Sequence, residues 1–385
     1  RLYRPFASEW FLECLPKTVK AIAVLDRTKE PGASGDPLYH DVVTSVYSHW
    51  QDDAARPSLP TLTRGRYGLS SKEFTPSMVV AVLNELVTAK PKPEFTIGIT
   101  DDVTNLSLPV EADAVPEADD VTRAVFYGLG SDGTVGASKN SATIIGQNSD
   151  LNVQGYFVYD SKKSGATTIS HLRFSPRPIE STYLIRDANF VGCHQFQFLE
   201  RMDVLELAKP GATFLLNSPY GAEEVWDELP GRVQEQILKK QLKVFVIDAD
   251  TVAREAGLGG RINTVLQTCF FALSGLFPRD EAIGHIKGSI KKTYSRRGET
   301  VVQRNVAAVD ATLSAMKQID TSSLQVTSPV VPAGLVWDKA PEFVQRVMSI
   351  IASGKGDLLP VSAFPVDGTF PTSTACLEKR SIAHD

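Results

Sequence analysis

A glycine-rich turn between a short apolar run and a helix-like segment constrains this chain more than any other feature. The apolar run spans residues 124–127, and four glycines follow within nine residues. Glycine permits positive φ and close approach of a ligand, so successive N–H groups can converge on an anion at the next helix start. The sequence therefore predicts a strand, a phosphate-binding loop and a helix, in this order. The four glycines are Gly128, Gly130, Gly133 and Gly136.

Side chains around the turn add further donors for a phosphate. Ser131 and Thr134 supply hydroxyl groups, and Lys139 supplies a positive charge. The glycine spacing fits G-x-G-x-x-G, but the acidic residue expected about 20 residues later is replaced by the basic pair Lys162 and Lys163. This pair favours a phosphorylated nucleotide over plain NAD. An ordinary tight turn is the alternative on these residues alone.

The turn and several other segments resemble one known family, the pyruvate:ferredoxin (flavodoxin) oxidoreductases, which include pyruvate:NADP oxidoreductase. The match runs in order along the whole chain. It implies an interior segment that covers the end of the family's second domain, its third domain and the start of its fourth. The matching segments are 2–6, 15–18, 24–32 and 65–69 for the second domain, 128–140, 159–165, 170–174 and 215–218 for the third, and 359–362, 367–372 and 378–380 after it.

The resemblance implies a thiamine diphosphate- and iron–sulfur-dependent enzyme that converts pyruvate and coenzyme A to acetyl-coenzyme A and carbon dioxide. Electrons would pass to ferredoxin, flavodoxin or NADP, and the full enzyme is expected to be a homodimer. The resemblance implies that thiamine diphosphate and magnesium bind outside this segment, in the family's first and sixth domains, and the sequence contains no G-D-G…N thiamine motif. The [4Fe-4S] clusters are also expected elsewhere, because clusters need closely spaced cysteines and the cysteines here are isolated. The segment alone is expected to be inactive and to contain no catalytic or metal-binding residue. The cysteines are Cys14, Cys193, Cys269 and Cys376.

The role implied for this segment is to bind and position coenzyme A. In the family a loop of the form D-x-x-K-S-G-G helps to hold the coenzyme. Lys162 and Lys163 lie in the matching loop, with Ala166 in place of its second glycine. Arg173 follows the same pattern, although Ser175 stands where the family usually has glycine.

Two further polar positions are candidates on chemical grounds. Asn217 ends a predicted strand, where its carboxamide can bond an amide or phosphate of the coenzyme, or alternatively cap the helix predicted from Glu223. Arg261 and Asn263 follow a glycine turn, with helix capping as the alternative. Because Gly130 and Gly133 are proposed to leave room for the ligand, Gly133→Val is expected to abolish coenzyme A binding and to leave the fold largely intact. The predicted coenzyme A site comprises Gly130, Ser131, Asp132, Gly133, Thr134, Val135, Lys139, Lys162, Lys163, Arg173, Asn217 and Arg261.

Alternating strand and helix signals predict an α/β fold with two main domains. Residues 1–108 are expected to be the C-terminal part of a doubly wound, transketolase C-terminal-like domain, and 109–120 an acidic linker. Residues 121–318 are expected to be a coenzyme A-binding α/β domain with the glycine-rich loop, and 319–385 a connecting segment that begins a further small domain. In the second domain, strands are predicted at 124–127, 154–159, 190–194, 212–216 and 242–247, and helices at 139–146, 198–208, 232–240, 262–276, 279–293 and 299–317.

Composition excludes some classes of function. The chain has 385 residues with a net charge of −5, which gives no reason to expect nucleic acid as a partner. No apolar run approaches the roughly 20 residues of a membrane span. Scattered cysteines predict a reducing compartment, the cytoplasm or the mitochondrial matrix, with no targeting segment visible. The expected partners are the remaining domains of the polypeptide, a second copy, and ferredoxin, flavodoxin or a fused NADP reductase.

Other interpretations of single motifs are weaker. Asp101 and Asp102 are expected to form a turn, because adjacent carboxylates on an extended segment face opposite ways. Cys193 and His194 are not expected to form a nucleophilic pair, because consecutive residues of a strand also face opposite sides. His171 and His194 are expected to be structural or loop histidines, because neither has a metal-ligand pattern nearby. Two other functions stay open: a non-catalytic interaction module derived from this family, and a stand-alone NADP-binding oxidoreductase domain built on the glycine turn.

Overall fold

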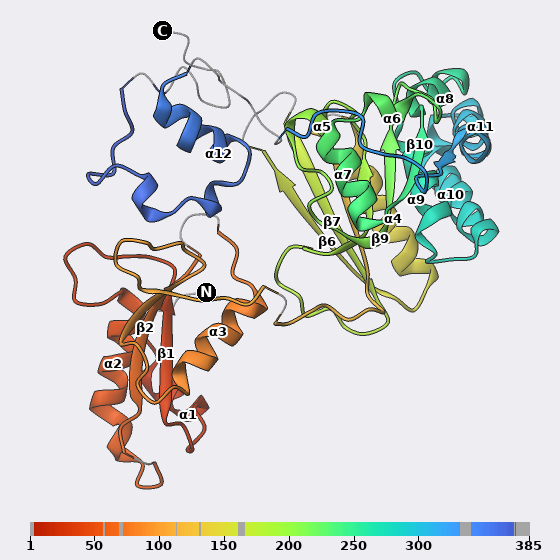
Figure 1. Cartoon of the computed structure of the whole chain (residues 1–385). Helices are drawn as coiled ribbons and strands as arrows, with labels where there is room; N and C mark the ends of the chain where they lie inside the picture. Colours follow the sequence, from red (N-terminus) through yellow and green to blue (C-terminus); the bar gives the residue numbers. More distant parts are fainter. Residues whose placement is uncertain are drawn as a thin grey trace. The chain divides into compact units, whose positions relative to one another are not determined.

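A computed structural model describes residues 4–56, 58–68, 72–112, 114–130, 132–160, 166–331, 340–372 and 374. The chain divides into two compact units (Figure 1). Unit 1 comprises residues 1–116 and 337–385, and unit 2 comprises residues 117–336. The chain therefore enters unit 2 from unit 1 and later returns to unit 1.

Unit 1 contains a four-stranded parallel sheet in the order β1-β2-β3-β4, with helices on both faces. One face packs against α1 and α2 around Val24, Val46 and Trp50, and the other packs against α3 around Met78 and Phe95. This arrangement confirms the predicted doubly wound α/β architecture. The elements are α1 (Ser8–Cys14), β1 (Ala21–Asp26), α2 (Pro37–His49), β2 (Thr61–Arg66), α3 (Pro76–Leu86), β3 (Glu94–Ile97) and β4 (Ser107–Leu108).

Within unit 1, Val361 and Ser362 from the C-terminal segment form hydrogen bonds with residues that follow β3. Val361 N donates to Thr100 O over 2.9 Å, and Ser362 N donates to the Asp102 carboxylate over 3.0 Å. The preceding helical stretch consists of a π-helical turn (Val344–Met348) and α12 (Ser349–Ala352).

Unit 2 contains a seven-stranded mixed sheet in the order β11-β10-β9-β8-β5-β7-β6. Strands β10, β9, β8 and β5 are parallel, whereas β11, β7 and β6 are antiparallel to their neighbours. The carboxyl ends of the four parallel strands thus meet at one edge, where α/β proteins bind ligands. The strands are β5 (Thr122–Leu129), β6 (Asn152–Tyr159), β7 (Thr167–Ser175), β8 (Ala188–Cys193), β9 (Ala208–Asn217), β10 (Lys243–Ile247) and β11 (Lys317–Ile319).

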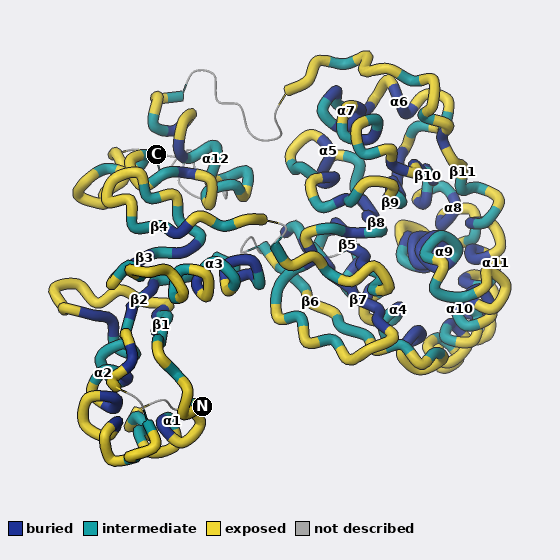
Figure 2. The backbone as a smooth tube through the Cα atoms, turned by 60° about the horizontal axis from the view of Figure 1, so that its bottom comes forward, coloured by how far each residue is buried: buried dark blue, intermediate teal, exposed yellow. Residues whose placement is uncertain are grey.

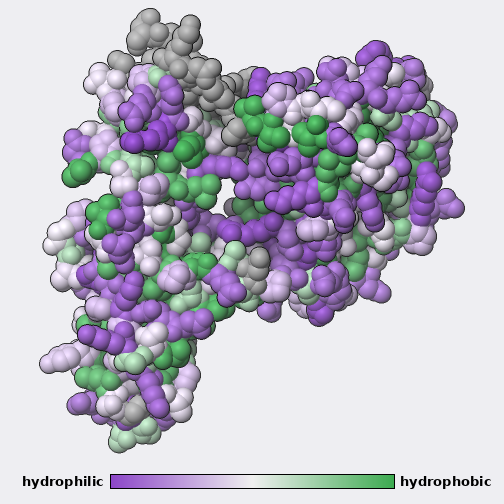
Figure 3. Space-filling model, in the orientation of Figure 1, coloured by the Kyte–Doolittle hydropathy of each residue, from purple (hydrophilic) through white to green (hydrophobic). Residues whose placement is uncertain are grey.

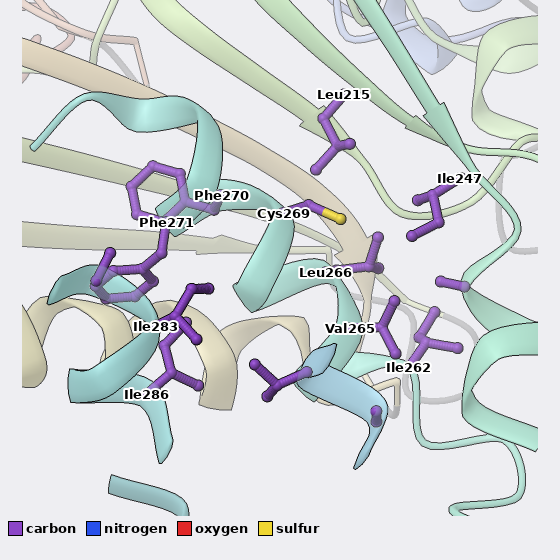
Figure 4. Packing of buried hydrophobic residues seen from close by; sticks show 14 of the residues in the cluster. Leu215, Ile247, Ile262, Val265, Leu266, Cys269, Phe270, Phe271, Ile283 and Ile286 are labelled. Atoms are coloured by element: carbon purple, nitrogen blue, oxygen red, sulfur yellow. The ribbon is translucent and has the colours of Figure 1, made fainter. Parts of the chain in front are cut away.

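Helices cover both faces of this sheet. The core on one face is built around α9, which is buried along most of its length and is among the most deeply buried segments (Figures 2 and 4). The core on the other face contains residues of α5, α6 and α7. The helices are α4 (Thr134–Asn148), α5 (Phe198–Arg201), α6 (Val225–Glu228), α7 (Gly231–Lys240), α8 (Ala249–Glu255), α9 (Asn263–Ser274), α10 (Arg279–Tyr294) and α11 (Glu299–Ala315).

Two of the predicted helices are wrong at their C-terminal ends. The helix predicted over 198–208 stops at Arg201, because the chain turns there to enter β9. Its apolar residues Val204 and Leu205 are still fully buried, but from a turn. The helix predicted over 299–317 stops at Ala315, since the next residues pair with β10 as an antiparallel strand.

The surface in view is largely hydrophilic, with small separate apolar patches (Figure 3). Within the described part of the chain, no helix combines the length and the apolar character that crossing a membrane demands.

Candidate functional site

The glycine-rich turn lies at the edge of the unit 2 sheet where the parallel strands end, between β5 and α4. Strand β5 ends at Leu129, and α4 begins at Thr134. Gly133 precedes the helix with φ at 82°, a left-handed conformation that favours glycine. The other three glycines of the turn do not have positive φ, so only one of the four is required for its backbone conformation.

A carboxylate from the turn itself occupies the start of α4. Asp132 accepts hydrogen bonds from Leu129 N over 2.7 Å and from Thr134 N over 2.9 Å. Gln195 Nε2 donates to the same carboxylate over 3.2 Å. Because an anion already satisfies these donors, a bound phosphate would be repelled from them. Asp132, predicted as a ligand residue, acts in this structure as a capping residue.

The β6–β7 hairpin brings a second loop to the same place. Gly130 N donates to Ala166 O over 2.8 Å, and Asp160 N donates to Thr167 O over 3.0 Å. The two ends of the hairpin loop are therefore fixed directly beside the glycine-rich turn. Lys162 and Lys163 belong to this loop, but they and Ser131 lie outside the described residues.

The start of α9 also reaches the turn. A Cβ atom placed on Gly133 would lie only 2.1 Å from Nδ2 of Asn263, so these two residues are in close contact. Arg261, two residues before Asn263, is exposed. Lys139 is exposed on α4, with its ammonium 5.2 Å from the centre of the Phe157 ring. Val135, in the first turn of the same helix, is half-buried.

Arg173 lies away from this group of loops. It pairs with Arg123 across β5 and β7, whereas the loop end of β5 pairs with Thr167. Six residues of strand separate the two positions, a distance of about 20 Å. Its guanidinium is almost fully buried and engages Glu117 in a bidentate ion pair at 2.9 and 2.7 Å. The prediction of Arg173 as a contact of the same ligand as the turn does not fit this geometry.

Asn217 is likewise engaged within the protein. Its Nδ2 donates to His194 O and to Asp250 Oδ2, and its Oδ1 accepts from Ala249 N over 2.9 Å. The buried carboxamide thus ties the ends of β8 and β9 to the start of α8. This differs from both predicted roles, because the capped helix is α8 rather than the one expected from Glu223.

His194 is a residue whose relation to the site the sequence did not show. It follows β8 directly, is 4% exposed, and places Nδ1 2.7 Å from Oγ1 of Thr134. Burial lowers its pKa to about 4. The signal in the sequence was a polar residue directly after a buried strand, which does not reveal the partner on another element.

The environment of Cys193 is not that of a nucleophile. Cys193 is completely buried, and its Sγ donates to the carbonyl of Gln195 over 3.2 Å. Burial raises the pKa of this thiol to about 12. A thiol of this kind is not a nucleophile.

The Asp101–Asp102 pair forms the predicted turn and no shared site. Asp101 accepts from the backbone N–H groups of Val103, Thr104 and Leu106. Asp102 instead accepts from Ser362. Hydrogen bonds from the Thr104 hydroxyl and backbone lower the pKa of Asp101 far below its usual range. Over the described residues, no group of His, Cys, Asp and Glu side chains is arranged to hold a metal ion.

Two buried histidines predict a loss of stability in mild acid. Burial lowers the pKa values of His171 and His194 to about 4, from 6.5. The unfolded chain therefore binds more protons than the folded chain between pH 6.5 and 4, and stability falls as pH falls through this range. Each histidine is expected to contribute up to about 1.4 kcal/mol per pH unit. Urea denaturation at pH 7 and pH 5 should show a shallower loss for His171→Gln; an unchanged slope would contradict the prediction.

Comparison with known proteins assigns the family of the chain. The pyruvate ferredoxin/flavodoxin oxidoreductase family model matches residues 123–315, and a domain of unknown function named EKR matches residues 333–383. Pyruvate-flavodoxin oxidoreductases of Rhodospirillum rubrum and Trichormus variabilis are 55% and 54% identical over the whole chain. A solved structure of the pyruvate oxidoreductase subunit PORC from Thermotoga maritima covers 52% of this chain and 99% of its own, with 17% identity and a TM-score of 0.42.

The chain spans about a third of the length of the curated relatives it matches, 32% of each of these two. It aligns with them over its complete length at more than half identity. On these matches, the chain belongs to the pyruvate ferredoxin/flavodoxin oxidoreductase family.

Proposed function

We propose that this chain is an interior part of a thiamine diphosphate- and iron–sulfur-dependent 2-oxoacid oxidoreductase and that unit 2 binds coenzyme A. The whole enzyme would convert pyruvate and coenzyme A to acetyl-coenzyme A and carbon dioxide, with electrons passing to ferredoxin, flavodoxin or NADP. Membership of the family supports the oxidoreductase activity. The described cysteines, Cys14, Cys193 and Cys269, are separate from one another in sequence, which fits cluster sites elsewhere in the polypeptide.

The convergence of three segments at the carboxyl end of β5 supports the coenzyme A site. The glycine-rich turn, the ends of the hairpin loop and the start of α9 meet there through Gly130, Ala166, Gly133 and Asn263. Because Asp132 places a negative charge at the start of α4 and accepts from its first N–H group, that of Thr134, we assign the coenzyme phosphates to cationic side chains rather than to the helix start. Lys162 and Lys163 belong to the loop held there, and Arg261 lies near the start of α9.

In this role the segment would contribute by position. Fixing the coenzyme beside the reacting groups removes much of the entropic cost of bringing two molecules together. The remaining domains of the polypeptide, a second copy and an electron acceptor would be its partners. The free buried thiols of Cys193 and Cys269 fit a reducing compartment, the cytoplasm or the mitochondrial matrix.

Charge removal in the hairpin loop tests the site. Each charge-assisted contact from Lys162 or Lys163 is expected to be worth about 1.5–3 kcal/mol, more than about tenfold in affinity. Calorimetric titration of the Lys162→Ala and Lys163→Ala variants should show weaker binding of coenzyme A, and a much smaller effect on dephospho-coenzyme A if the contact is to the 3′-phosphate. Added salt should weaken binding further.

Lys243→Ala provides the matched control, since this exposed lysine begins β10 at the opposite edge of the sheet. It should leave both affinities unchanged. Equal losses of affinity for coenzyme A and dephospho-coenzyme A would indicate that the lysines contact the pyrophosphate rather than the 3′-phosphate. Unchanged affinity after replacing both lysines together would remove the loop from the site, and selective binding of NADP instead would favour a nucleotide-binding oxidoreductase domain.

A further inference from the structure

His194 connects the end of β8 to the helix that follows the glycine-rich turn. Its backbone N–H donates to Tyr127 O over 2.9 Å, and its carbonyl accepts from Asn217 Nδ2 over 3.1 Å, so three parallel strands hold it in place. Its ring lies edge-on to Phe126 and places Nδ1 2.7 Å from the Thr134 hydroxyl. Thr134 is the first residue of α4 and is 1% exposed. The imidazole therefore joins the end of β8 to the helix that the turn opens.

His194 also lines a small cavity. Nε2 of His194 is buried and has no hydrogen-bond partner among the described residues. The cavity has a volume of about 10 Å³ and is lined by His194, Ser138, Ser141 and Gln267, together with apolar residues. Gln267 Nε2 donates to Ser141 Oγ over 2.9 Å. This volume is close to the lower limit for holding one water molecule, and the lining includes polar residues.

A neutral imidazole needs a partner at both nitrogens. If the Thr134 hydroxyl donates to Nδ1, then Nε2 carries the proton and requires an acceptor; if Nδ1 donates, then Nε2 requires a donor. A water molecule satisfies either case, whereas an unpaired buried nitrogen costs about 1–3 kcal/mol. Burial lowers the pKa of His194 to about 4, so the ring is neutral near pH 7.

We propose that His194 is a positioning residue for the glycine-rich turn, acting through its bond to Thr134 and through one internal water bound at Nε2 between β8, α4 and α9. The water would link the histidine to Ser138, Ser141 or Gln267. The histidine would fix the position of the first turn of α4 relative to β8. An effect of His194 on coenzyme A binding rests on the proposed function, whereas its effect on the position of the turn does not.

Hydrogen–deuterium exchange in the polypeptide that carries this chain tests the positioning role without a ligand. His194→Gln and Thr134→Val each remove the bond, and each should speed exchange of amides 128–136 by about tenfold. The double variant should be no faster than the faster single variant. His171→Gln is the matched control, because His171 is also 4% exposed with an unpartnered nitrogen, but it pairs with Val125 and Tyr156 rather than contacting the turn.

Equal exchange of 128–136 in the wild type and both variants overturns the proposal, and so does an equal increase in His171→Gln. Thr134→Val, which keeps the shape of the side chain, answers the question if His194→Gln does not fold. A crystal structure should show one water within hydrogen-bond distance of His194 Nε2. A cavity without this water overturns the proposal that a water binds at Nε2.

Steady-state kinetics separates this proposal from the coenzyme A site. If both hold, Thr134→Val should raise KM for coenzyme A by about tenfold and leave KM for pyruvate unchanged. If exchange speeds up but KM for coenzyme A does not move, the positioning of the turn stands and the coenzyme A site at the turn fails.

Discussion

Replacing Arg173 with methionine is expected to lower the free energy of unfolding by about 3–5 kcal/mol. The guanidinium is 2% exposed, and it donates to both oxygens of Glu117, whose side chain is 9% exposed. Its remaining nitrogen donates to Gln154 Oε1 and Tyr183 O, both over 2.9 Å. The large cost arises because methionine fills much of the space but leaves a buried carboxylate without its partner.

Urea denaturation of the variant measures this effect, with Arg177→Met as the control. Arg177 pairs with Asp120 at a similar distance, 2.7 Å, but the two side chains are 60% and 46% exposed. An exposed pair of this kind is worth less than about 1 kcal/mol. Equal losses for Arg173→Met and Arg177→Met would show that burial does not determine the cost.

Glu117→Gln combined with Arg173→Met should recover part of the lost stability, since no charge is then left buried. The folded Arg173 variant should also retain its affinity for coenzyme A, because the ion pair lies about six strand residues, roughly 20 Å, from the turn. Loss of binding in a folded variant would return Arg173 to the ligand site.

The parallel strands of unit 2 were predictable because each contains a short, mostly apolar and buried run, such as residues 124–127 in β5 and 214–216 in β9. Strand β7 was not predicted, since its sequence Thr-Thr-Ile-Ser-His-Leu-Arg-Phe-Ser carries polar residues at buried positions. The buried charge of Arg173 is tolerated there because of its long-range partner Glu117. Partners of this kind lie 56 residues apart and leave no local pattern.

The candidate site was predictable to the same limited extent. The glycine turn indicated where a strand meets a helix, and this was confirmed by β5 and α4. The sequence did not reveal that Asp132 caps the turn or that Asn217 ties three elements together, because both roles depend on how neighbouring strands end. A polar residue at the end of a strand has the same local signature whether it binds a ligand or another loop.

The expectation that Gly133→Val leaves the fold largely intact does not fit this geometry. Gly133 has φ at 82°, and a Cβ atom there would lie 2.1 Å from Nδ2 and 2.8 Å from Cγ of Asn263. The left-handed backbone costs about 1–2 kcal/mol for a residue with a side chain, and forced overpacking costs about 1–3 kcal/mol more. We expect Gly133→Val to lower the free energy of unfolding by about 2–5 kcal/mol in urea denaturation.

A double variant separates the two causes. Gly133→Ala combined with Asn263→Gly removes the clash and keeps the backbone cost, so its loss should exceed that of Asn263→Gly alone by only about 1–2 kcal/mol. Gly136→Ala is the control, because this helical glycine has no atom within 4 Å of an added Cβ. It should gain about 0.5–1 kcal/mol, since alanine is the better helix residue. If Gly133→Ala costs the same with and without Asn263, the contact between α9 and the turn does not contribute, and the α9 arm of the proposed coenzyme A site loses its support.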